Sequence, residues 1–268
     1  MFTSVYIDKI EDVMQLIADQ QRNAKINRLR SGYYYRGQLN TAHKMRTSLY
    51  RNCGERRHEL ESSILRYFTK YASIEDPTLR ESVWRQMIEG QHNGLPTRLL
   101  DWTHSALVGL HFAMSETDLK EMDKHDCCVW RIDMAEMVAH LPQKYRNIVE
   151  SQEVTIFSVD TLAEATGNSL KQYDKDMGDS AMVVMEPPSI NQRIVNQYSF
   201  FSVVPMAIDD IEDFLNRKTE NTIKYIINKD LRWRIRDMLD QLNMSERIVY
   251  PGLPGLCKWI SRHYYVRD

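Results

Sequence analysis

The chain has 268 residues, a formal net charge of −2 and a pI near 6.5. Hydrophobic residues make up 43% and charged residues 27%, which is typical of a globular protein. The net charge and pI argue against a strongly basic nucleic-acid surface but are compatible with a local basic patch. No run of about 18 apolar residues predicts a membrane span, and the acidic start of the chain does not resemble a signal peptide. Four cysteines without CxxC spacing predict a reduced, cytoplasmic protein with no zinc site.

The first half of the chain combines helical patterns with one aromatic strand. Apolar residues at helical spacing predict three helices, over residues 8–21, 57–71 and 78–89. A charged linker over 22–30 leads to a strand that begins with three tyrosines, Tyr33–Tyr35. We expect one domain over 1–268, in which this N-terminal helix and linker (1–29) precede a core at about 30–262.

The densest group of polar side chains lies in Gln91–Thr103. Amide, imidazole, guanidinium, carboxylate and hydroxyl groups alternate there with leucines and a tryptophan, which indicates a half-buried site. Gly90 is expected to end the helix before it, and Thr103 or Ser105 to cap a helix over 105–113. Asp101 is the strongest acid–base candidate; the alternative is an ion pair with Arg98 or a helix cap.

The second half reads as richer in strands. Short β-branched or aromatic runs predict strands over 127–132, 154–159, 182–185, 200–204 and 223–227. Helices are expected over 231–242 and about 254–261, and a charged loop over 117–126. Because βαβ alternation is lacking, we predict an α+β fold: a helical N-terminal half packed on a mainly antiparallel sheet.

Two motifs together resemble the FRG domain family. Tyr35–Gln38 fits its Tyr-Arg-Gly signature, and Gln91–Thr103, followed by Phe112-Ala113, fits its longest motif. Three further segments are similar to other elements of the family: Ser48–Arg51, Arg193–Gln197 and Tyr250–Leu256. The resemblance covers roughly residues 30 to 262, but it does not by itself define a biochemical activity.

The order of these motifs is also similar to that of mono-ADP-ribosyltransferases, which implies a transferase-like β core and NAD as substrate. In this analogy Arg36 would clamp the diphosphate, and Tyr34 or Tyr198 would stack on nicotinamide. The residues predicted to be catalytic are Arg36, His92, Asp101 and Gln197. Those predicted to bind NAD are Arg36, Gly37, Gln38, Arg98, Thr103 and Arg193.

The sequence departs from the transferase pattern at Gln197, where a glutamate is expected. A glutamine can orient a group but brings no charge, and such a loss typically costs several kcal/mol of transition-state stabilisation. Asp101 or Glu186 would have to supply the acid, or the chain does not catalyse. No metal site is expected, because His104 and His111 could share a helix face but have no third ligand at a suitable spacing.

Two functional hypotheses follow. The first is an NAD-dependent ADP-ribosyltransferase-like enzyme, a bacterial toxin or phage-defence effector that modifies a protein or nucleic acid and is restrained by an antitoxin or inhibitor. The second is a non-catalytic module that binds a nucleotide, nucleic acid or protein in the same cleft. A basic face for nucleic acid could be built from Arg22, Lys25, Arg28, Arg30, Lys44, Arg46 and Arg51.

Overall fold

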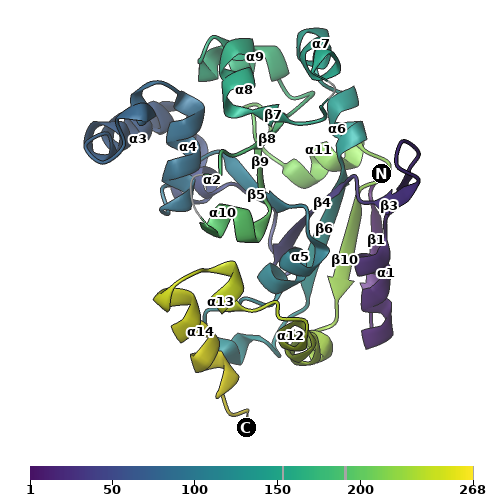
Figure 1. Ribbon diagram of the computed structural model, residues 1–268. Coiled ribbons are helices and arrows are strands. Elements are labelled where there is room, and N and C mark those ends of the chain that lie inside the picture. Colours follow the sequence, from purple (N-terminus) through teal and green to yellow (C-terminus); the bar gives the residue numbers. More distant parts are fainter. Residues whose placement is uncertain (153, 190–191, 268) are drawn as a thin grey trace.

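The computed structural model describes residues 1–152, 154–189 and 192–267, and a twisted eight-stranded sheet runs through this part of the chain (Figure 1). The strands, in chain order, are β1 (Thr3–Ile7), β4 (Tyr33–Gln38), β5 (Leu99–Thr103), β6 (Cys127–Asp133), β7 (Phe157–Ser158), β8 (Val184–Glu186), β9 (Ser199–Val203) and β10 (Ile223–Ile227). Their order across the sheet is β1-β10-β6-β4-β5-β9-β8-β7. Only the outer pairs β1–β10 and β7–β8 are parallel, so the predicted mainly antiparallel sheet is confirmed.

Side chains alternate between the two faces of the central strands, and both faces are covered. In β4, Tyr33 and Tyr35 pack on one face, whereas Tyr34 packs on the other with Trp102 and Trp130. Every residue of β6 is buried, which is expected of a central strand with helices on both sides.

Three hydrophobic clusters hold the helices against the sheet. One face carries α1 (Val13–Ala18), α5 (Ala106–Ala113) and α12 (Arg232–Gln241). The other face carries α6 (Met134–Ala139) and α11 (Ile211–Lys218). The third cluster, at the β9–β8–β7 end, gathers α4 (Val83–His92), α7 (Gln143–Ser151), α8 (Val159–Thr166) and α9 (Leu170–Met177).

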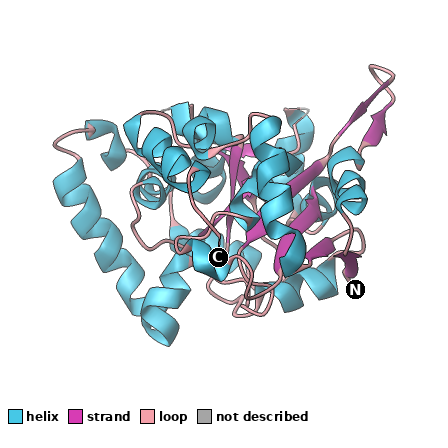
Figure 2. Ribbon diagram, turned by 90° about the horizontal axis from the view of Figure 1, so that it is seen from below, coloured by secondary structure: helices cyan, strands magenta, loops and turns pink. Residues whose placement is uncertain are grey.

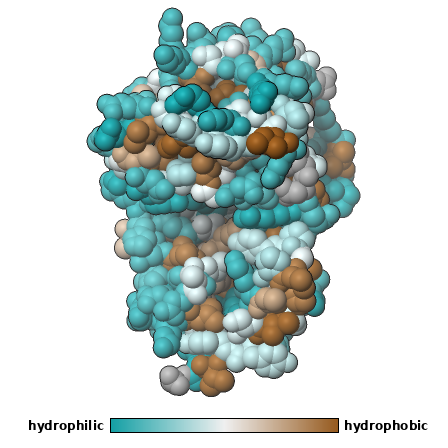
Figure 3. Space-filling model, turned by 90° about the vertical axis from the view of Figure 1, so that its left-hand side faces the viewer, coloured by the Kyte–Doolittle hydropathy of each residue, from teal (hydrophilic) through white to brown (hydrophobic). Residues whose placement is uncertain are grey.

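The remaining helices frame the outside of the molecule. They are α2 (Ser48–Cys53), α3 (Arg57–Ala72), α10 (Gln192–Gln197), α13 (Glu246–Val249) and α14 (Leu253–His263). Short 3-10 turns lie at Ile10–Asp12, Gly54–Arg56, Pro77–Arg80, Leu119–Glu121 and Lys229–Leu231. Helix α3 packs on α4 and extends outward (Figure 2), and hydrophobic atoms show between hydrophilic ones on the face of the molecule that includes it (Figure 3). No helix among the described residues is long and apolar enough to cross a membrane.

Several predicted elements need correction. The helix expected over 8–21 is a 3-10 turn followed by α1, and the charged linker is a two-stranded hairpin of β2 (Gln21–Asn23) and β3 (Arg28–Arg30). The strand expected over 154–159 shrinks to β7, because Ser158 accepts a hydrogen bond from Thr161 N and starts α8; residue 153 lies outside the described residues.

The second half is also more helical than predicted. Among the described residues it contains α6 to α14, and all of these helices except α12 and α14 have nine residues or fewer. Short helices give few turns of hydrophobic periodicity, so their sequences resemble loops or strands until tertiary packing decides between these structures.

Candidate functional site

The polar motif lies where the sheet opens. Strands β4 and β5 pair only at Tyr35 and Thr103, and beyond that pair they diverge. The opening is a cavity of about 330 Å³. Its walls are formed by β4, β5, α5, α10 and the segment after α13, through Tyr35, Arg36, Gly37, Leu39, Gln91, Asp101, Trp102, Thr103, Phe112, Ser115, Arg193, Gln197, Ser199 and Tyr250. We refer to it as the β4–β5 cleft.

Arg36 enters this cleft from β4 with part of its hydrogen-bonding capacity unused. Its Nη1 donates to the carbonyl oxygen of Asp101 at 2.8 Å and lies 3.6 Å from the Asp101 Oδ2. The Arg36 Nε is buried and has no partner among the described residues. Burial lowers the pKa of this guanidinium, and the Asp101 carboxylate opposes the shift. A cation held in this way is suited to receive an anionic ligand.

The Asp101 carboxylate is oriented by Gln91, which the sequence analysis did not single out. The Gln91 Nε2 donates to both Asp101 oxygens, at 3.2 and 3.3 Å. The Gln91 Oε1 accepts from the Thr97 hydroxyl at 2.6 Å and the Ser48 hydroxyl at 3.4 Å. Because the hydroxyls bind the amide oxygen, the NH₂ group faces Asp101. The carboxylate stays 55% exposed, so it is positioned and still accessible.

Thr103 and Gln197 lie together on the same side of the cleft, where the Thr103 hydroxyl and the Gln197 NH₂ group have partners within the protein. The Thr103 hydroxyl donates to Gln197 O at 2.7 Å and accepts from Ser105 N at 3.1 Å. Ser105 accepts from Val108 N and is the N-cap of α5, as predicted. The Gln197 Nε2 donates to Val249 O at 3.2 Å, and the residue ends helix α10 rather than facing out of a strand. Gln197 therefore ties α10 to α13.

Arg193 connects the cleft to a second, more open hollow of about 780 Å³. Its Nη1 donates to His92 O at 3.3 Å, and its Cζ lies 5.1 Å from the centroid of the Tyr250 ring. As in Arg36, its Nε is buried and lacks a partner among the described residues. His92 lines only the second hollow, where burial and the nearby Arg193 lower its pKa.

Two of the β4 residues predicted to bind NAD have structural roles. A side chain at Gly37 would overlap the backbone of Gly109 and Ala113, so glycine is needed for α5 to pack on β4. The Gln38 amide donates to Asn40 O at 2.9 Å and also to His43 O, which shapes the loop after the strand. Gly37 lines the cleft, whereas Gln38 does not.

The predicted pair of Arg98 with Asp101 is wrong, and Arg98 is not among the residues that line the cleft in which it was predicted to bind NAD. Its side chain is 3% exposed and binds Glu61 through Nε at 2.7 Å and Asp174 through Nη1 at 2.6 Å. Burial by itself lowers the pKa of this arginine, but the two carboxylates outweigh burial and raise it. Arg98 thus joins α3, β5 and α9 in the interior.

Other aromatic and imidazole predictions also change. Tyr34 is buried against Phe200 on the opposite face of the sheet, and Tyr198 is 60% exposed outside the cleft. His104 approaches Ser31 O at 2.9 Å, whereas His111 is buried and accepts a hydrogen bond at Nδ1 from Arg236 at 2.9 Å. The two histidines therefore have separate partners.

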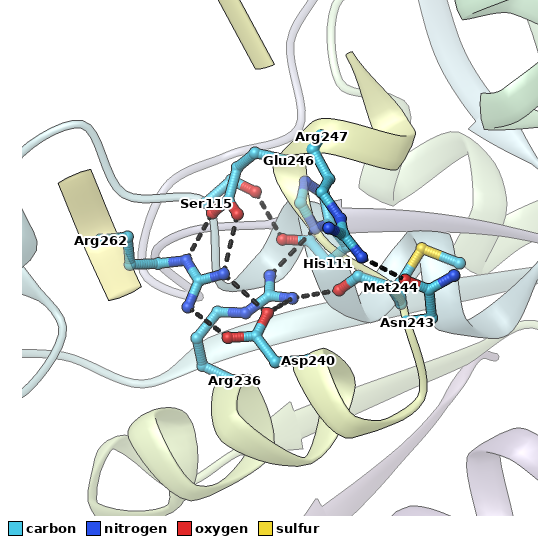
Figure 4. A network of polar contacts seen from close by, with 9 residues as sticks. All are labelled: His111, Ser115, Arg236, Asp240, Asn243, Met244, Glu246, Arg247 and Arg262. Carbon is cyan, nitrogen blue, oxygen red and sulfur yellow. Dashed lines mark hydrogen bonds and ion pairs between the residues drawn. The ribbon is translucent and has the colours of Figure 1, made fainter. Parts of the chain in front are cut away.

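The C-terminal helices that border the cleft are held by a buried ionic network (Figure 4). Arg262 binds Glu246 at 2.6 and 2.8 Å and Asp240 at 2.7 and 2.8 Å, so it links α12, α13 and α14. Arg236 donates to His111 and to Met244 O, which connects the same network to α5. Tyr250 follows α13 and is thereby placed at the cleft.

Tyr250 lines the cleft but was not predicted as a site residue, although its segment is similar to a closing element of the family. It also missed Gln91, the first residue of the polar motif, for which the hydroxyls in the same motif and in Ser48–Arg51 were the available signal.

A larger hollow among the described residues is an apolar groove of about 860 Å³ along α3, lined mainly by aromatic and aliphatic side chains such as Tyr67, Phe68 and Leu79. Because the groove lacks converging charged groups of both signs, we assign the candidate site to the smaller polar cleft.

Residues 31–122 match the model of the FRG domain family. The match includes both motifs that predicted the resemblance and the β4 and β5 walls of the cleft. Neither the curated proteins nor the solved structures contain a match to this chain.

Proposed function

Because residues 31–122 form an FRG domain whose two motifs meet in the β4–β5 cleft, we propose that the chain is an NAD-dependent ADP-ribosyltransferase-like enzyme. The observation that carries this proposal is the convergence of Arg36, Arg193 and Asp101 on one cavity. The cleft and the adjoining hollow have volumes of about 330 and 780 Å³. Ligand pockets commonly span about 300–1,000 Å³, so the space suits a dinucleotide. The opening of the sheet between β4 and β5 supports a transferase-like core.

The two arginines would hold the diphosphate of NAD. Each has a buried Nε without a partner among the described residues, and a diphosphate supplies the acceptor oxygens that a guanidinium binds best. Arg36 keeps its contact to the Asp101 backbone, so its position is fixed before the ligand arrives. The ring of Tyr250, next to Arg193, offers an aromatic surface for a base or for nicotinamide.

Asp101 would supply the negative charge that Gln197 cannot. Transfer breaks the bond between ribose C1′ and nicotinamide nitrogen, the electron pair leaves with nicotinamide, and the acceptor forms the new bond to C1′. A carboxylate beside C1′ stabilises the positive charge that develops there and can take the acceptor's proton. Asp101 is held by Gln91 and exposed to the cleft, whereas Glu186 is not among the cleft residues.

The acceptor in this proposal is a macromolecule, protein or nucleic acid, which fits a cytoplasmic toxin or phage-defence effector held in check by an antitoxin or inhibitor. The free cysteines, Cys53, Cys127, Cys128 and Cys257, support a reducing compartment. The alternative is a non-catalytic module that binds its ligand in the same cleft, and the glutamine at position 197 favours it.

The test is nicotinamide release from NAD, measured with and without cell lysate. We expect Arg36→Ala and Asp101→Asn each to lower release about 100-fold or more, because each removes a charge that acts at the reacting bond or the diphosphate. The matched control is Arg217→Ala, an exposed arginine on α11 paired with Asp213, which should release nicotinamide at the wild-type rate.

Release at the wild-type rate by a folded Arg36→Ala variant would sink the proposal. If wild type releases nothing yet binds NAD, and Arg36→Ala does not bind, the cleft belongs to a binding module instead.

A further inference from the structure

The hairpin of β2 and β3 is the most basic exposed segment of a chain whose formal net charge is −2. Residues 20–32 contain no aspartate or glutamate. Their basic residues are Arg22, Lys25, Arg28 and Arg30. All six strand residues are exposed, and the hairpin projects from the body of the molecule (Figure 2). Because the hairpin concentrates positive charge and projects from a protein of negative net charge, it is suited to bind a polyanionic partner.

The hairpin is ordered at both ends. At its tip, Asn23 Oδ1 accepts from Lys25 N at 3.0 Å and from Ile26 N at 3.4 Å, and Asn27 adopts a positive φ of 51°. At its base, the Gln21 amide donates to the Tyr33 hydroxyl at 2.8 Å, which anchors the ribbon to β4. The arm therefore presents its charges on a preformed scaffold and loses little entropy on binding.

The pairing register sorts the side chains between the two faces of the ribbon. Asn23 pairs with Arg28 and Gln21 with Arg30, so these residues share one face; Arg22 and Leu29 share the other. Arg28 and Arg30 are two residues apart on one strand, which separates their Cα atoms by about 6.7 Å. Two arginines at this spacing, beside an asparagine, can contact phosphates along a groove together with a base edge.

We propose that the β2–β3 hairpin is a nucleic-acid-binding arm that enters the major groove of duplex DNA. The major groove of B-form DNA admits a two-stranded β-ribbon, whereas the major groove of A-form RNA is too deep and narrow for side chains to read. Arg28 and Arg30 contact the phosphates, and Arg22, held by Asn27 through its Nε at 3.0 Å, adds charge at the tip.

The proposed arm is independent of the β4–β5 cleft. The hairpin joins β4 before Tyr33, whereas Arg36 and Gly37 line the cleft near the other end of the same strand. The other predicted basic residues also lie beyond that far end, where Lys44 binds Asp210 at 2.6 Å and Arg46 stacks on Tyr50. The seven basic residues therefore do not form one patch, and the arm supplies only the first four.

The test is binding of the full chain to a fluorescent DNA duplex of about 20 base pairs, followed by anisotropy in the absence of NAD at several salt concentrations. We expect Arg28→Gln/Arg30→Gln to weaken binding at least tenfold at low salt. It should also reduce the slope of log K against log salt by about 2, one unit for each phosphate contact. The matched control is Arg217→Gln/Arg234→Gln, two exposed arginines of α11 and α12, which should bind like wild type.

Three outcomes would overturn the proposal: no binding of wild type to duplex DNA, equal binding by the hairpin variant, or preferential binding of duplex RNA or anionic phosphatidylserine vesicles through the arm. Because the binding assay contains no NAD, a failure of the protein to release nicotinamide would not affect the DNA-binding proposal. Equal unfolding midpoints of wild type and the hairpin variant would show that a loss of binding is not a loss of fold.

Discussion

Two arginines close to the same sheet opening form very different sites. Arg36 in the cleft lies 3.6 Å from a carboxylate oxygen of Asp101, which is 55% exposed. Arg98, three residues before Asp101, lies within 2.7 Å of carboxylates on Glu61 and Asp174 and is 3% exposed. In the interior site the nitrogens of Arg98 are bound by carboxylates, whereas in the cleft Arg36 keeps hydrogen-bonding capacity for a further acceptor. The polar residues of the two motifs therefore divide between interior ion pairs and the candidate ligand cleft, and we expect mutations in the interior to lower stability and mutations in the cleft to lower activity.

The largest effect is expected at the interior site. Arg98→Ala leaves Glu61 buried without its cation, and removal of one partner of a buried ion pair typically costs about 3–5 kcal/mol. We expect the free energy of unfolding in urea to fall by this amount. The cleft variant Arg36→Ala should lose about 1 kcal/mol or less, since its carboxylate partner is solvated.

A double change makes the comparison sharper. Arg98→Met/Glu61→Leu replaces both charges by apolar groups of similar length and should recover much of the lost stability, although Asp174 keeps a partly exposed, unpaired carboxylate. If Arg98→Ala proved as stable as Arg36→Ala, the division into an interior site and a cleft site would be wrong.

The sequence predicted the class of fold, the family and several residues of the candidate cleft for identifiable reasons. Long periodic patterns gave α3, α4 and α12, and the tyrosine run gave β4. Arg36, Asp101, Thr103, Arg193 and Gln197 line one cavity, as predicted, whereas His92, predicted to join them, lines only the adjoining hollow. The match to the FRG domain family includes both motifs that predicted the resemblance and confirms it.

The predictions that failed concern residues whose roles depend on contacts with parts of the chain distant in sequence. The sequence favours a pair of Arg98 with Asp101 because the two are three residues apart, but the partners of Arg98 in the structure are Glu61 of α3 and Asp174 of α9, 37 and 76 residues away. Gly90 was expected to end a helix, yet α4 continues to His92, because Gly90 instead makes room for Leu95; a Cβ there would lie 2.7 Å from Leu95 Cδ2. Such roles follow from packing and have no local signal.

The next effect concerns pH and the buried network behind the cleft (Figure 4). Burial, reinforced by Arg236, lowers the pKa of His111 from 6.5 to about 3. The unfolded chain therefore takes up a proton between pH 6.5 and 3 that the folded chain refuses, so stability falls as the pH drops through this window. We expect His111 alone to remove about 2 kcal/mol between pH 7 and pH 5, measured by urea unfolding at both values.

The control for this effect is His111→Asn, in which the amide oxygen takes over the acceptor role of Nδ1 toward Arg236. Its stability at pH 7 reports lost packing, but its change between pH 7 and pH 5 should be about 2 kcal/mol smaller than that of wild type. The pKa of Glu246 is lowered to about 2 by Arg262, against its burial, so its own contribution is lost only below pH 4.5, outside the interval between pH 7 and pH 5 in which the two proteins are compared. An identical pH dependence in both proteins would contradict the prediction.

The smallest expected effect tests whether Gln91 positions the Asp101 carboxylate for the proposed reaction. If Gln91 orients Asp101, Gln91→Ala should lower kcat for nicotinamide release about tenfold, which corresponds to about 1.4 kcal/mol, with little change in KM. The free energy of unfolding of this variant should stay within about 1 kcal/mol of the wild-type value. Gln86→Ala is the matched control, because Gln86 lies on the same helix and donates to Leu79 O away from the cleft. Thr97→Val should give an intermediate loss, since it frees the Gln91 amide to rotate without removing it. A Gln91→Ala variant with wild-type kcat would mean that Asp101 does not need Gln91 to orient it. The distinction between the fully bonded interior site and the cleft would then depend on Arg36 alone.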